Sequence, residues 1–498
     1  MPRAIWKAFY SLIVLATTGA MSIHGQTFTT LVNFDIRDGH SPVATLLQSS
    51  DGNLYGTTLY GGSDSTCKRG CGTLFGMTAR GTLTSLASFA TYDYPQNGVL
   101  QATNGTLYGT TSSGGDLNCK FGSGYGCGTV FTVSSTGEVM TLYTFCSRQD
   151  CIDGAAPSGT LIQATGGNFY GTTLEGGLSS DEWCENGGCG TIFKITPEGA
   201  LTTLYEFCEQ YLCLDGAKPN AGVIQGTDGN LYGTTTSGGA NNGGTVFKIT
   251  LGGNYSVLYS FDSYSDPTGA LIQGTNGNFY GTTYTGAEDD GTVFQVTQAG
   301  VMTTLHRFLG GPRDGAYPYA GLIQGSDGNF YGTTVDAGAG GSGTVFEITP
   351  AGVLTLLHSF CADGDSRGSP PYARCPDGKL PYAALTQDTN GEFYGSTYEG
   401  GAGGCGAGCG TIFSLSLGLG PFVETQPSTN KVGGGVGILG TDLTGATSVT
   451  FNGVAAVFRV VSSSLISASV PPGASTGLVS VTTSSGTLTS NKPFIVKP

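Results

Sequence analysis

A four-residue signature, tyrosine followed by Gly-Thr-Thr, recurs along this chain and constrains its fold more than any other feature. Successive copies are separated by 48 to 63 residues, so the signature marks a tandem repeat of the length used by propeller blades. The last copy reads Tyr-Gly-Ser-Thr. The seven copies begin at Tyr55, Tyr108, Tyr170, Tyr232, Tyr280, Tyr331 and Tyr394.

Each repeat contains four short runs, here called a, b, c and d. Run a is apolar and ends in glutamine, run b holds the signature, run c reads Gly-Thr-Val-Phe or similar, and run d reads Leu-Thr-Thr-Leu-Tyr or similar. The runs are rich in Thr, Val, Ile, Tyr and Phe and are separated by turn residues, which predicts strands and no amphipathic helix. Asp228-Gly229 and Asn276-Gly277, between runs a and b, predict two-residue hairpins.

The two ends of the repeat region complement each other. The run from Thr27 to Phe34 is a d run with no a, b or c before it, and the seventh repeat ends at Leu415 with no d run. A ring of blades would close by pairing the first strand with the last three, which removes exposed sheet edges. The sequence therefore predicts an all-β, seven-bladed β-propeller of four-stranded blades over residues 26–416, with the N-terminal strand closing the last blade.

The repeat stops at residues 417–421, which we interpret as a linker. Residues 422–498 contain short alternating strands and no cysteine. A segment of this length and pattern predicts a small immunoglobulin-like β-sandwich.

The N-terminus has the pattern of an export signal. Arg3 and Lys7 precede a mostly apolar run from Ala8 to Ala16, which is too short to span a bilayer, since spanning needs about 20 residues. We therefore expect residues 1–25 to be a cleaved signal peptide and the protein to be secreted or held in the cell envelope, without membrane insertion. The formal net charge of −15 argues against a nucleic-acid partner.

Two family resemblances cover nearly all of the chain. The unit from Val223 to Phe261 resembles the Gloeo-Verruco (GloVer) tandem repeat of exported bacterial proteins, and this resemblance extends over residues 27–416. The C-terminal segments Gly-Ile-Leu-Gly-Thr-Asp-Leu and Ser-Val-Pro-Pro-Gly resemble an IPT/TIG domain. The repeat resemblance implies no biochemical activity, and IPT/TIG domains serve as spacers or interaction modules.

The 14 cysteines form close pairs, which predicts disulfides in an exported chain. A zinc site needs four ligands, whereas each repeat offers one pair without a neighbouring histidine. All pairs lie in b–c or d–a connections, which share one face of an up-and-down propeller; we call these loops the cystine face and expect it to be the working face. The predicted pairs are Cys67 with Cys71, Cys119 with Cys127, Cys146 with Cys151, Cys184 with Cys189, Cys208 with Cys213, Cys361 with Cys375, and Cys405 with Cys409.

Non-repeated residues of the cystine face are the binding candidates, because a repeated residue would form the same site seven times. A tryptophan flanked by carboxylates can stack on a sugar ring and bind its hydroxyls, or it can pack against its own disulfide, and both interpretations remain open. The candidates are Asp181, Trp183, Glu185, Glu209, Tyr211, Glu288, Asp289 and Asp290.

A second series reads Asp-Gly-x-x-Pro in the d–a loops. Its carboxylates would lie near one rim, where they could bind calcium or glycan hydroxyls, or they could close an Asx-turn. The glutamines that end run a could likewise line a central channel, or their amides could satisfy backbone groups. The rim carboxylates are Asp38, Asp153, Asp215, Asp314 and Asp377.

The sequence favours a non-catalytic recognition or scaffold protein that presents the cystine face to a glycan or an extracellular protein. A carbohydrate-active hydrolase or lyase and a structural envelope component are the alternatives. His40, His306 and His358 have no recognisable pairing with serine or cysteine, so no catalytic residue is assigned. No cofactor or resident metal is assigned, calcium apart, and the sequence specifies no oligomeric state.

Overall fold

The protein is built from β-strands, as its sequence predicts. The computed structural model describes residues 25–497 except positions 65, 91, 120–124, 135–136, 178–183, 185–186, 287–288 and 363–374. No helix in this part of the chain is long and apolar enough to cross a membrane. The predicted signal peptide lies almost entirely outside the described residues. The single-turn 3-10 helices are η1 (Gln149–Cys151), η3 (Tyr211–Cys213) and η4 (Leu443–Gly445).

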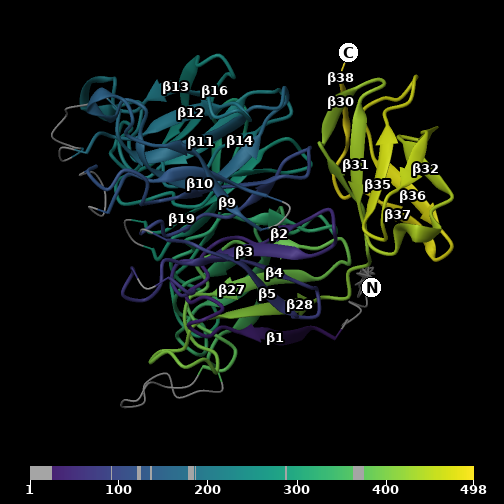
Figure 1. The fold of residues 1–498 in the computed structure, drawn as a ribbon, viewed down its shortest axis with the longest axis horizontal. Helices are drawn as coiled ribbons and strands as arrows, with labels where there is room; N and C mark the ends of the chain where they lie inside the picture. Colours follow the sequence, from purple (N-terminus) through teal and green to yellow (C-terminus); the bar gives the residue numbers. More distant parts are fainter. Residues whose placement is uncertain are drawn as a thin grey trace, which may run out of the picture.

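The repeat region consists of four-stranded antiparallel sheets, in six of which the strands follow the order a, b, c, d (Figure 1). Strand a ends at the repeated glutamine and is usually only two residues long, because the chain joins the sheet just one residue before that glutamine. The strands of these six sheets are β2 (Leu47–Gln48), β3 (Leu54–Thr58), β4 (Thr73–Met77) and β5 (Leu83–Ser88); β6 (Leu100–Gln101), β7 (Leu107–Thr111), β8 (Thr129–Val133) and β9 (Val139–Thr144); β10 (Ala155–Gln163), β11 (Phe169–Glu175), β12 (Thr191–Ile195) and β13 (Leu201–Glu206); β14 (Ile224–Gln225), β15 (Leu231–Thr235), β16 (Thr245–Ile249) and β17 (Tyr255–Ser260); β18 (Ile272–Gln273), β19 (Phe279–Thr283), β20 (Thr292–Val296) and β21 (Met302–Arg307); and β22 (Ile323–Gln324), β23 (Phe330–Thr334), β24 (Thr344–Ile348) and β25 (Leu354–Ser359).

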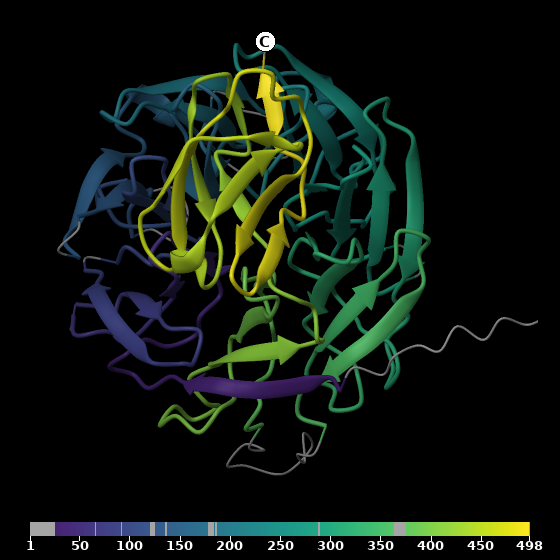
Figure 2. The same ribbon diagram turned by 90° about the vertical axis from the view of Figure 1, so that its right-hand side faces the viewer.

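A further sheet joins the two ends of the repeat region. It contains β26 (Thr386–Gln387), β27 (Phe393–Thr397) and β28 (Thr411–Ser416), and its fourth strand is β1 (Thr27–Asn33). β1 pairs antiparallel with β28, with Thr27 opposite Ser416. Figure 2 shows β1, in purple, lying along the green strands of this last sheet. The N-terminal strand thus completes the last sheet, as the unmatched d run predicts.

Phenylalanines pack each sheet against the next. The phenylalanine after a d strand contacts the phenylalanine of the next sheet's c strand edge-on, with ring centroids 5.1 to 5.5 Å apart, a geometry that aromatic pairs favour. This contact also links the last sheet to the first. The pairs are Phe34 with Phe75, Phe89 with Phe131, Phe145 with Phe193, Phe207 with Phe247, Phe261 with Phe294, Phe308 with Phe346, and Phe360 with Phe413.

The repeated glutamines form a second series of contacts between sheets. Each side-chain oxygen accepts a hydrogen bond from a backbone N–H in the a–b turn of the preceding sheet, at 2.8 to 3.1 Å. These amides therefore satisfy backbone groups, one of the two roles considered for them. The donors and their acceptors are Ser50 to Gln101, Thr103 to Gln163, Thr165 to Gln225, Thr227 to Gln273, Thr275 to Gln324, Ser326 to Gln387, and Thr389 to Gln48.

The a–b turns differ from the predicted two-residue hairpins. Gly226 and Asn230 face each other across the turn, and the N–H of Gly229 donates to the carbonyl of Gly226. The prediction of two-residue loops was wrong. The chain makes a turn from Gly226 to Gly229, in which Gly229 has φ +83°, and this is the arrangement of a longer hairpin loop. Asp228 Oδ1 accepts a hydrogen bond from the Asn230 N–H at 3.1 Å, so this aspartate still stabilises the turn.

Residues 422–497 form a separate C-terminal unit with its own buried core, which includes Val436, Ile466, Val481 and Phe494. It contains two four-stranded sheets and a parallel pair of strands. The first sheet is β29 (Glu424–Gln426), β31 (Gly435–Leu439), β35 (Leu465–Ser469) and β34 (Phe458–Val460); the second is β33 (Val454–Ala455), β32 (Ser448–Phe451), β36 (Val479–Thr483) and β37 (Gly486–Thr489); the pair is β30 (Thr429–Lys431) and β38 (Ile495–Lys497).

The C-terminal unit rests on the a–b turns of the repeat region. Gln426 Nε2 donates to the carbonyl of Gln101 at 2.9 Å, and Ser464 Oγ donates to the carbonyl of Ser50 at 2.9 Å. Figure 2 shows the unit, in yellow, in front of the sheets of the repeat region. Strand b runs from the a–b turn to the b–c loop, so the unit covers the end of the sheets opposite the cystine face.

Candidate functional site

All seven predicted disulfides are present with the predicted partners, and no cysteine in the described part of the chain is free. The bonds join Cys67 to Cys71, Cys119 to Cys127, Cys146 to Cys151, Cys184 to Cys189, Cys208 to Cys213, Cys361 to Cys375, and Cys405 to Cys409.

Each bond closes a short segment within one b–c or d–a loop. Cys71 and Cys409 lie just before the c strands β4 and β28, and Cys375 lies in the d–a loop that precedes β26. Seven loops of the cystine face are therefore closed covalently, on the side of the repeat region away from the C-terminal unit. Such loops lose less conformational entropy when they bind a ligand.

Two disulfides of the third repeat pack against each other. The sulfurs of Cys184, Cys189, Cys208 and Cys213 all lie within 4.8 Å of one another. The expectation that each repeat offers one pair was wrong here, because this repeat carries one pair in its b–c loop and a second in its d–a loop, and the two loops converge. The four buried cysteines thus pack these two loops against each other.

The second repeat shows the same convergence. The sulfurs of Cys119 and Cys127, from the b–c loop, lie within 4.8 Å of the sulfur of Cys146, from the d–a loop. All three sulfurs are already bonded in disulfides, so they are not the free thiolates that a metal ion requires. The expectation of one pair in each repeat was therefore wrong in this repeat too.

The predicted binding residues of the third repeat are only partly described. Asp181, Trp183 and Glu185 lie outside the described residues. Glu209 and Tyr211 lie in the d–a loop next to the paired disulfides, and Tyr211 is 81% exposed. Partial burial, with the nearby carboxylates of Glu206 and Asp215, raises the pKa of Glu209.

The acidic residues of the fifth b–c loop have internal partners. Glu288 lies outside the described residues. Asp289 is almost fully buried and accepts from Arg307 Nη1 at 2.6 Å. Asp290 hydrogen-bonds the Tyr317 hydroxyl and raises the pKa of that tyrosine. This loop joins β19 to β20, a different sheet from the one that carries Glu209, so the predicted candidates belong to separate loops.

Two of the rim carboxylates are fully buried. Asp153 accepts from the Tyr143 hydroxyl at 2.7 Å and from the Ser147 N–H at 3.0 Å. Asp215 accepts from the Tyr205 hydroxyl at 2.7 Å and, in the same way, from the backbone of its own loop. Each carboxylate joins strand d to the loop that follows it.

In the d strands β21 and β25 a histidine replaces the tyrosine. His306 Nε2 lies 3.1 Å from Asp314 Oδ1, and His358 Nε2 lies 3.0 Å from Asp377 Oδ2. Asp38 is partly exposed, and burial together with neighbouring Asp35 raises its pKa. Four of the five rim carboxylates thus bond both to strand d and to the loop that follows it. A calcium or glycan role for the series stays a prediction.

An arc of tyrosines that was not predicted from the sequence lies on the cystine face. Its first part starts at His40, whose ring lies 5.5 Å from that of Tyr60. Tyr60 contacts Tyr94 at 5.7 Å, Tyr94 contacts Tyr92 at 6.3 Å, and Tyr92 stacks on Tyr125 at 4.5 Å. These rings come from the b–c and d–a loops of the first two repeats.

The second part of the arc comes from the fifth to seventh repeats. Tyr317 lies 5.2 Å from Tyr284, which lies 5.9 Å from Tyr319. Tyr319 meets Tyr382 edge-on at 5.3 Å, and Tyr382 meets Tyr398 at 5.6 Å. Burial and then the neighbouring tyrosines, Tyr284 first, raise the pKa of Tyr382.

The two parts meet where the last sheet adjoins the first. Burial is the main cause that raises the pKa of Tyr398, and the neighbouring Tyr60 is the second. The Arg69 guanidinium lies 5.9 Å from the centre of the Tyr60 ring. We define the tyrosine arc as Tyr60, Tyr92, Tyr94, Tyr125, Tyr284, Tyr317, Tyr319, Tyr382 and Tyr398.

Asp93 lies between two members of the arc in sequence. Burial raises its pKa to about 6, from an ordinary value of 3.8. Sequence reasoning assigned it no role. The positions of these tyrosines in the repeat could have indicated the region. Tyr284 and Tyr398 directly follow the repeated signature, and Tyr94 and Tyr382 adjoin prolines in d–a loops. None of these tyrosines occurs in all seven repeats.

His40, which lies next to Tyr60 of the tyrosine arc, does not activate an accessible nucleophile. His40 Nδ1 lies 2.6 Å from Ser41 Oγ, a serine contact that the sequence analysis did not recognise. Ser41 is fully buried, so its hydroxyl is closed to a substrate.

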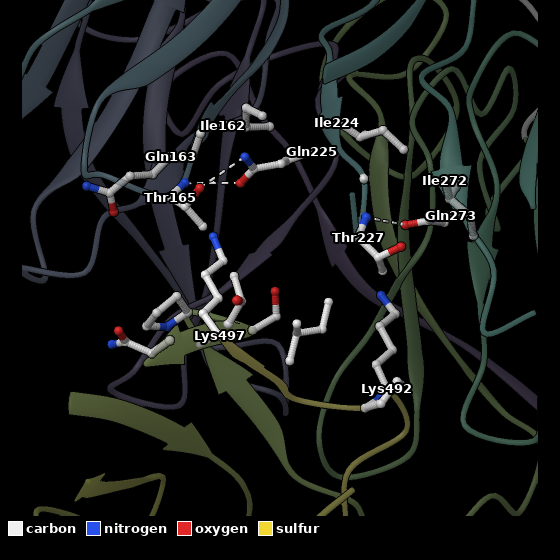
Figure 3. A pocket seen from close by; sticks show the side chains of 18 of the residues that line it. Ile162, Gln163, Thr165, Ile224, Gln225, Thr227, Ile272, Gln273, Lys492 and Lys497 are labelled. Atoms are coloured by element: carbon white, nitrogen blue, oxygen red, sulfur yellow. Dashed lines mark hydrogen bonds between the residues drawn. The ribbon is translucent and has the colours of Figure 1, made fainter. Parts of the chain in front are cut away.

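A cavity of about 1210 Å³ lies on the opposite side of the molecule, between the a–b turns and the C-terminal unit (Figure 3). The turns contribute glutamine, threonine and isoleucine side chains from the second to fifth repeats. The C-terminal unit contributes Lys431, Lys492 and Lys497.

The sequence profile described as the Gloeobacter/Verrucomicrobia repeat matches residues 20–182, 94–286 and 179–407. None of the curated proteins matches the sequence.

Two solved structures are similar to this chain. A fungal alcohol oxidase in complex with copper is 13% identical, with a TM-score of 0.50, over 95% of this chain and 99% of that one. The extracellular domain of a proposed hybrid two-component system from B. thetaiotaomicron is 10% identical, with a TM-score of 0.46, over 95% of this chain and 59% of that one. At 13% identity the similarity to the alcohol oxidase concerns the fold alone.

Proposed function

We propose a function for this chain, which belongs to the Gloeobacter/Verrucomicrobia repeat family: it is an exported recognition protein whose cystine face binds a glycan. The observation that carries the proposal is the tyrosine arc. A tyrosine ring offers an apolar face for the C–H side of a sugar and a hydroxyl that can both donate and accept hydrogen bonds. An array of adjacent rings suits successive units of a saccharide.

The architecture we propose for this role is a closed seven-bladed β-propeller followed by an immunoglobulin-like IPT/TIG domain. The pairing of β1 with β28 supports closure, as do the phenylalanine and glutamine contacts that continue from the last sheet to the first. Closure would bring loops from the first and last repeats together, which is where Tyr60 neighbours Tyr398. The C-terminal unit would act as a spacer on the opposite side.

Export is supported by the disulfides. Seven such bonds in one chain are typical of an oxidising compartment outside the cytoplasm. The basic and apolar N-terminal segment agrees with this location.

The test is binding of the chain from residue 26 onwards to a panel of immobilised neutral polysaccharides, with its thermal unfolding recorded alongside. A selective ligand that competes in solution would support the proposal. Failure of the folded protein to bind any member of the panel would overturn it. Soluble sugar fragments released from a bound polysaccharide would instead indicate the hydrolase or lyase alternative.

A further inference from the structure

We propose that the cavity between the repeat region and the C-terminal unit binds an acidic oligosaccharide, one whose sugar units carry carboxylate groups. This site lies on the side of the molecule opposite the tyrosine arc. It is therefore a second site, independent of the proposed function.

The cavity is large enough for several sugar units. Its volume of about 1210 Å³ exceeds the roughly 300 to 1,000 Å³ of common small-molecule pockets. One wall consists of the a–b turns with Ile162, Ile224 and Ile272, and the other of residues from Pro427 to Lys431 and from Lys492 to Lys497. A single inorganic anion would leave most of this space unfilled.

The charge of the cavity is opposite to that of the molecule. Three lysines contribute to the lining, and no aspartate or glutamate does among the described residues. The whole chain carries a formal net charge of −15, so an uncompensated cationic cavity is unexpected here. Figure 3 shows Lys492 and Lys497 pointing from the C-terminal unit into the cavity, towards Thr227 and Thr165 on the opposite wall.

The three ammonium groups are available to a ligand. Each ion pair in the described part of the chain involves other residues, so Lys431, Lys492 and Lys497 lack a carboxylate partner there. Lysine is a compact point charge with three donors and binds anions without the planar geometry that arginine imposes. Carboxylates spaced along a flexible oligosaccharide fit such separated charges.

The lining also offers an unused hydrogen-bonding group. Thr429 Oγ1 is buried and has no partner among the described residues. Buried hydroxyls are nearly always satisfied, so this atom indicates a missing partner such as a water molecule or a ligand hydroxyl. Thr429 lines the cavity two residues before Lys431.

The remaining lining favours a sugar over other anions. Ile162, Ile224, Ile272 and Ile495 provide aliphatic surface for the C–H faces of sugar rings. The lining contains no aromatic side chain in the described residues, so a nucleic acid would find no ring on which to stack its bases.

The test is calorimetric titration of the chain from residue 26 onwards with a galacturonate trimer, a neutral galactose trimer and inorganic phosphate. We expect the acidic trimer to bind, the neutral trimer to bind at least tenfold more weakly, and affinity to fall with added salt because the contacts are ionic. Binding of phosphate alone, or no binding of the acidic trimer, would overturn the proposal.

Variants locate the site. The double variant Lys492→Gln with Lys497→Gln should lose roughly tenfold or more in affinity for the acidic trimer, as expected when two charge contacts are removed. Lys68→Gln, an exposed lysine of the cystine face, is the control and should bind as the unaltered protein does. If the double variant unfolds, Lys431→Gln alone should still weaken binding severalfold.

The outcomes separate this site from the tyrosine arc. Unchanged affinity in a folded lysine variant, or loss of acidic-trimer binding in Tyr382→Ala, would place the ligand elsewhere and overturn the proposal. Failure of the neutral-glycan panel would leave this result untouched, because the probes and the altered residues differ.

Discussion

The side-chain oxygen of Gln48 accepts a hydrogen bond from the backbone N–H of Thr389 at 3.1 Å, although the two residues are 341 positions apart in the sequence. Gln48 Nε2 also donates to Asp388 Oδ1 at 2.6 Å and to Thr389 Oγ1 at 2.7 Å. In the other repeats the same nitrogen donates to a glycine of its own turn, as Gln273 does to Gly277. The first sheet therefore binds the last sheet with more hydrogen bonds than any neighbouring pair makes through this residue.

Replacing Gln48 tests that contact. Gln48→Leu removes the partners of a buried carboxylate and a buried N–H, so we expect a loss of about 1 to 3 kcal/mol in the free energy of unfolding by urea. The matched control is Gln273→Leu, which removes the ordinary version of the contact and should cost less. An equal or smaller loss in Gln48→Leu would contradict a special role at the junction of the two ends.

The tyrosine arc predicts a graded binding defect. Tyr382 contacts both Tyr319 and Tyr398, so Tyr382→Ala interrupts the arc at an internal position. We expect affinity for a neutral glycan found on the panel to fall at least tenfold, since about 1.4 kcal/mol corresponds to that factor.

The control for this prediction is another tyrosine of the cystine face. Tyr264 is 74% exposed in a d–a loop and makes no aromatic ring contact within the described residues. Tyr264→Ala should bind as the unaltered protein does. Equal losses in the two variants, measured by calorimetry on protein with an unchanged melting temperature, would exclude the arc as the binding surface.

Asp93 predicts a pH-dependent stability. Its pKa is about 6 in the folded protein and 3.8 ordinarily, so folding disfavours the charged form. The stabilising effect is complete below about pH 4 and is lost as the pH rises through about 6. Asp93→Asn should therefore leave stability unchanged at pH 4 and raise it at pH 8, by at most about 3 kcal/mol.

Denaturant unfolding at both pH values checks this prediction. An equal gain in the free energy of unfolding at pH 4 and pH 8 would show that the effect of Asp93→Asn comes from packing and not from ionisation. A neutral-pH gain accompanied by weaker glycan binding would indicate that the carboxylate is kept for recognition at the expense of stability.

The disulfides predict a modest stability effect and no free thiols. Thiol titration of the denatured, unreduced protein should find none. Cys184→Ser combined with Cys189→Ser should cost about 2 kcal/mol, because the closed loop is short and the entropy it removes from the unfolded chain is small. Several reactive thiols in the unaltered protein would refute the pairing.

Much of the fold could be predicted because the same sequence pattern recurs seven times. Local or repeated features of the sequence determine the strand runs, the unmatched d run at Thr27 and the pairing of each cysteine with its near neighbour. The hairpin loops were misjudged because Asp228-Gly229 occurs in turns of more than one length, and the dipeptide alone does not decide between them.

The candidate sites were largely invisible in the sequence. Tyr60 and Tyr398 lie near opposite ends of the repeat region, and only the joining of the last sheet to the first makes them neighbours. Lys492 and Lys497 line a cavity only because the C-terminal unit rests on the a–b turns. A repeat pattern specifies how units stack, but it does not specify which loops meet or where an attached unit docks.

The pairing of β1 with β28 also has a consequence for biosynthesis. A ribosome releases β1 as the first strand of the repeat region and β28 as the last, so the β1 edge remains unpaired while every intervening sheet is made. The last sheet can be completed only when the whole repeat region is available. Premature termination within the repeats would therefore leave an open edge at each end, and such a fragment would be prone to pair with other copies of itself.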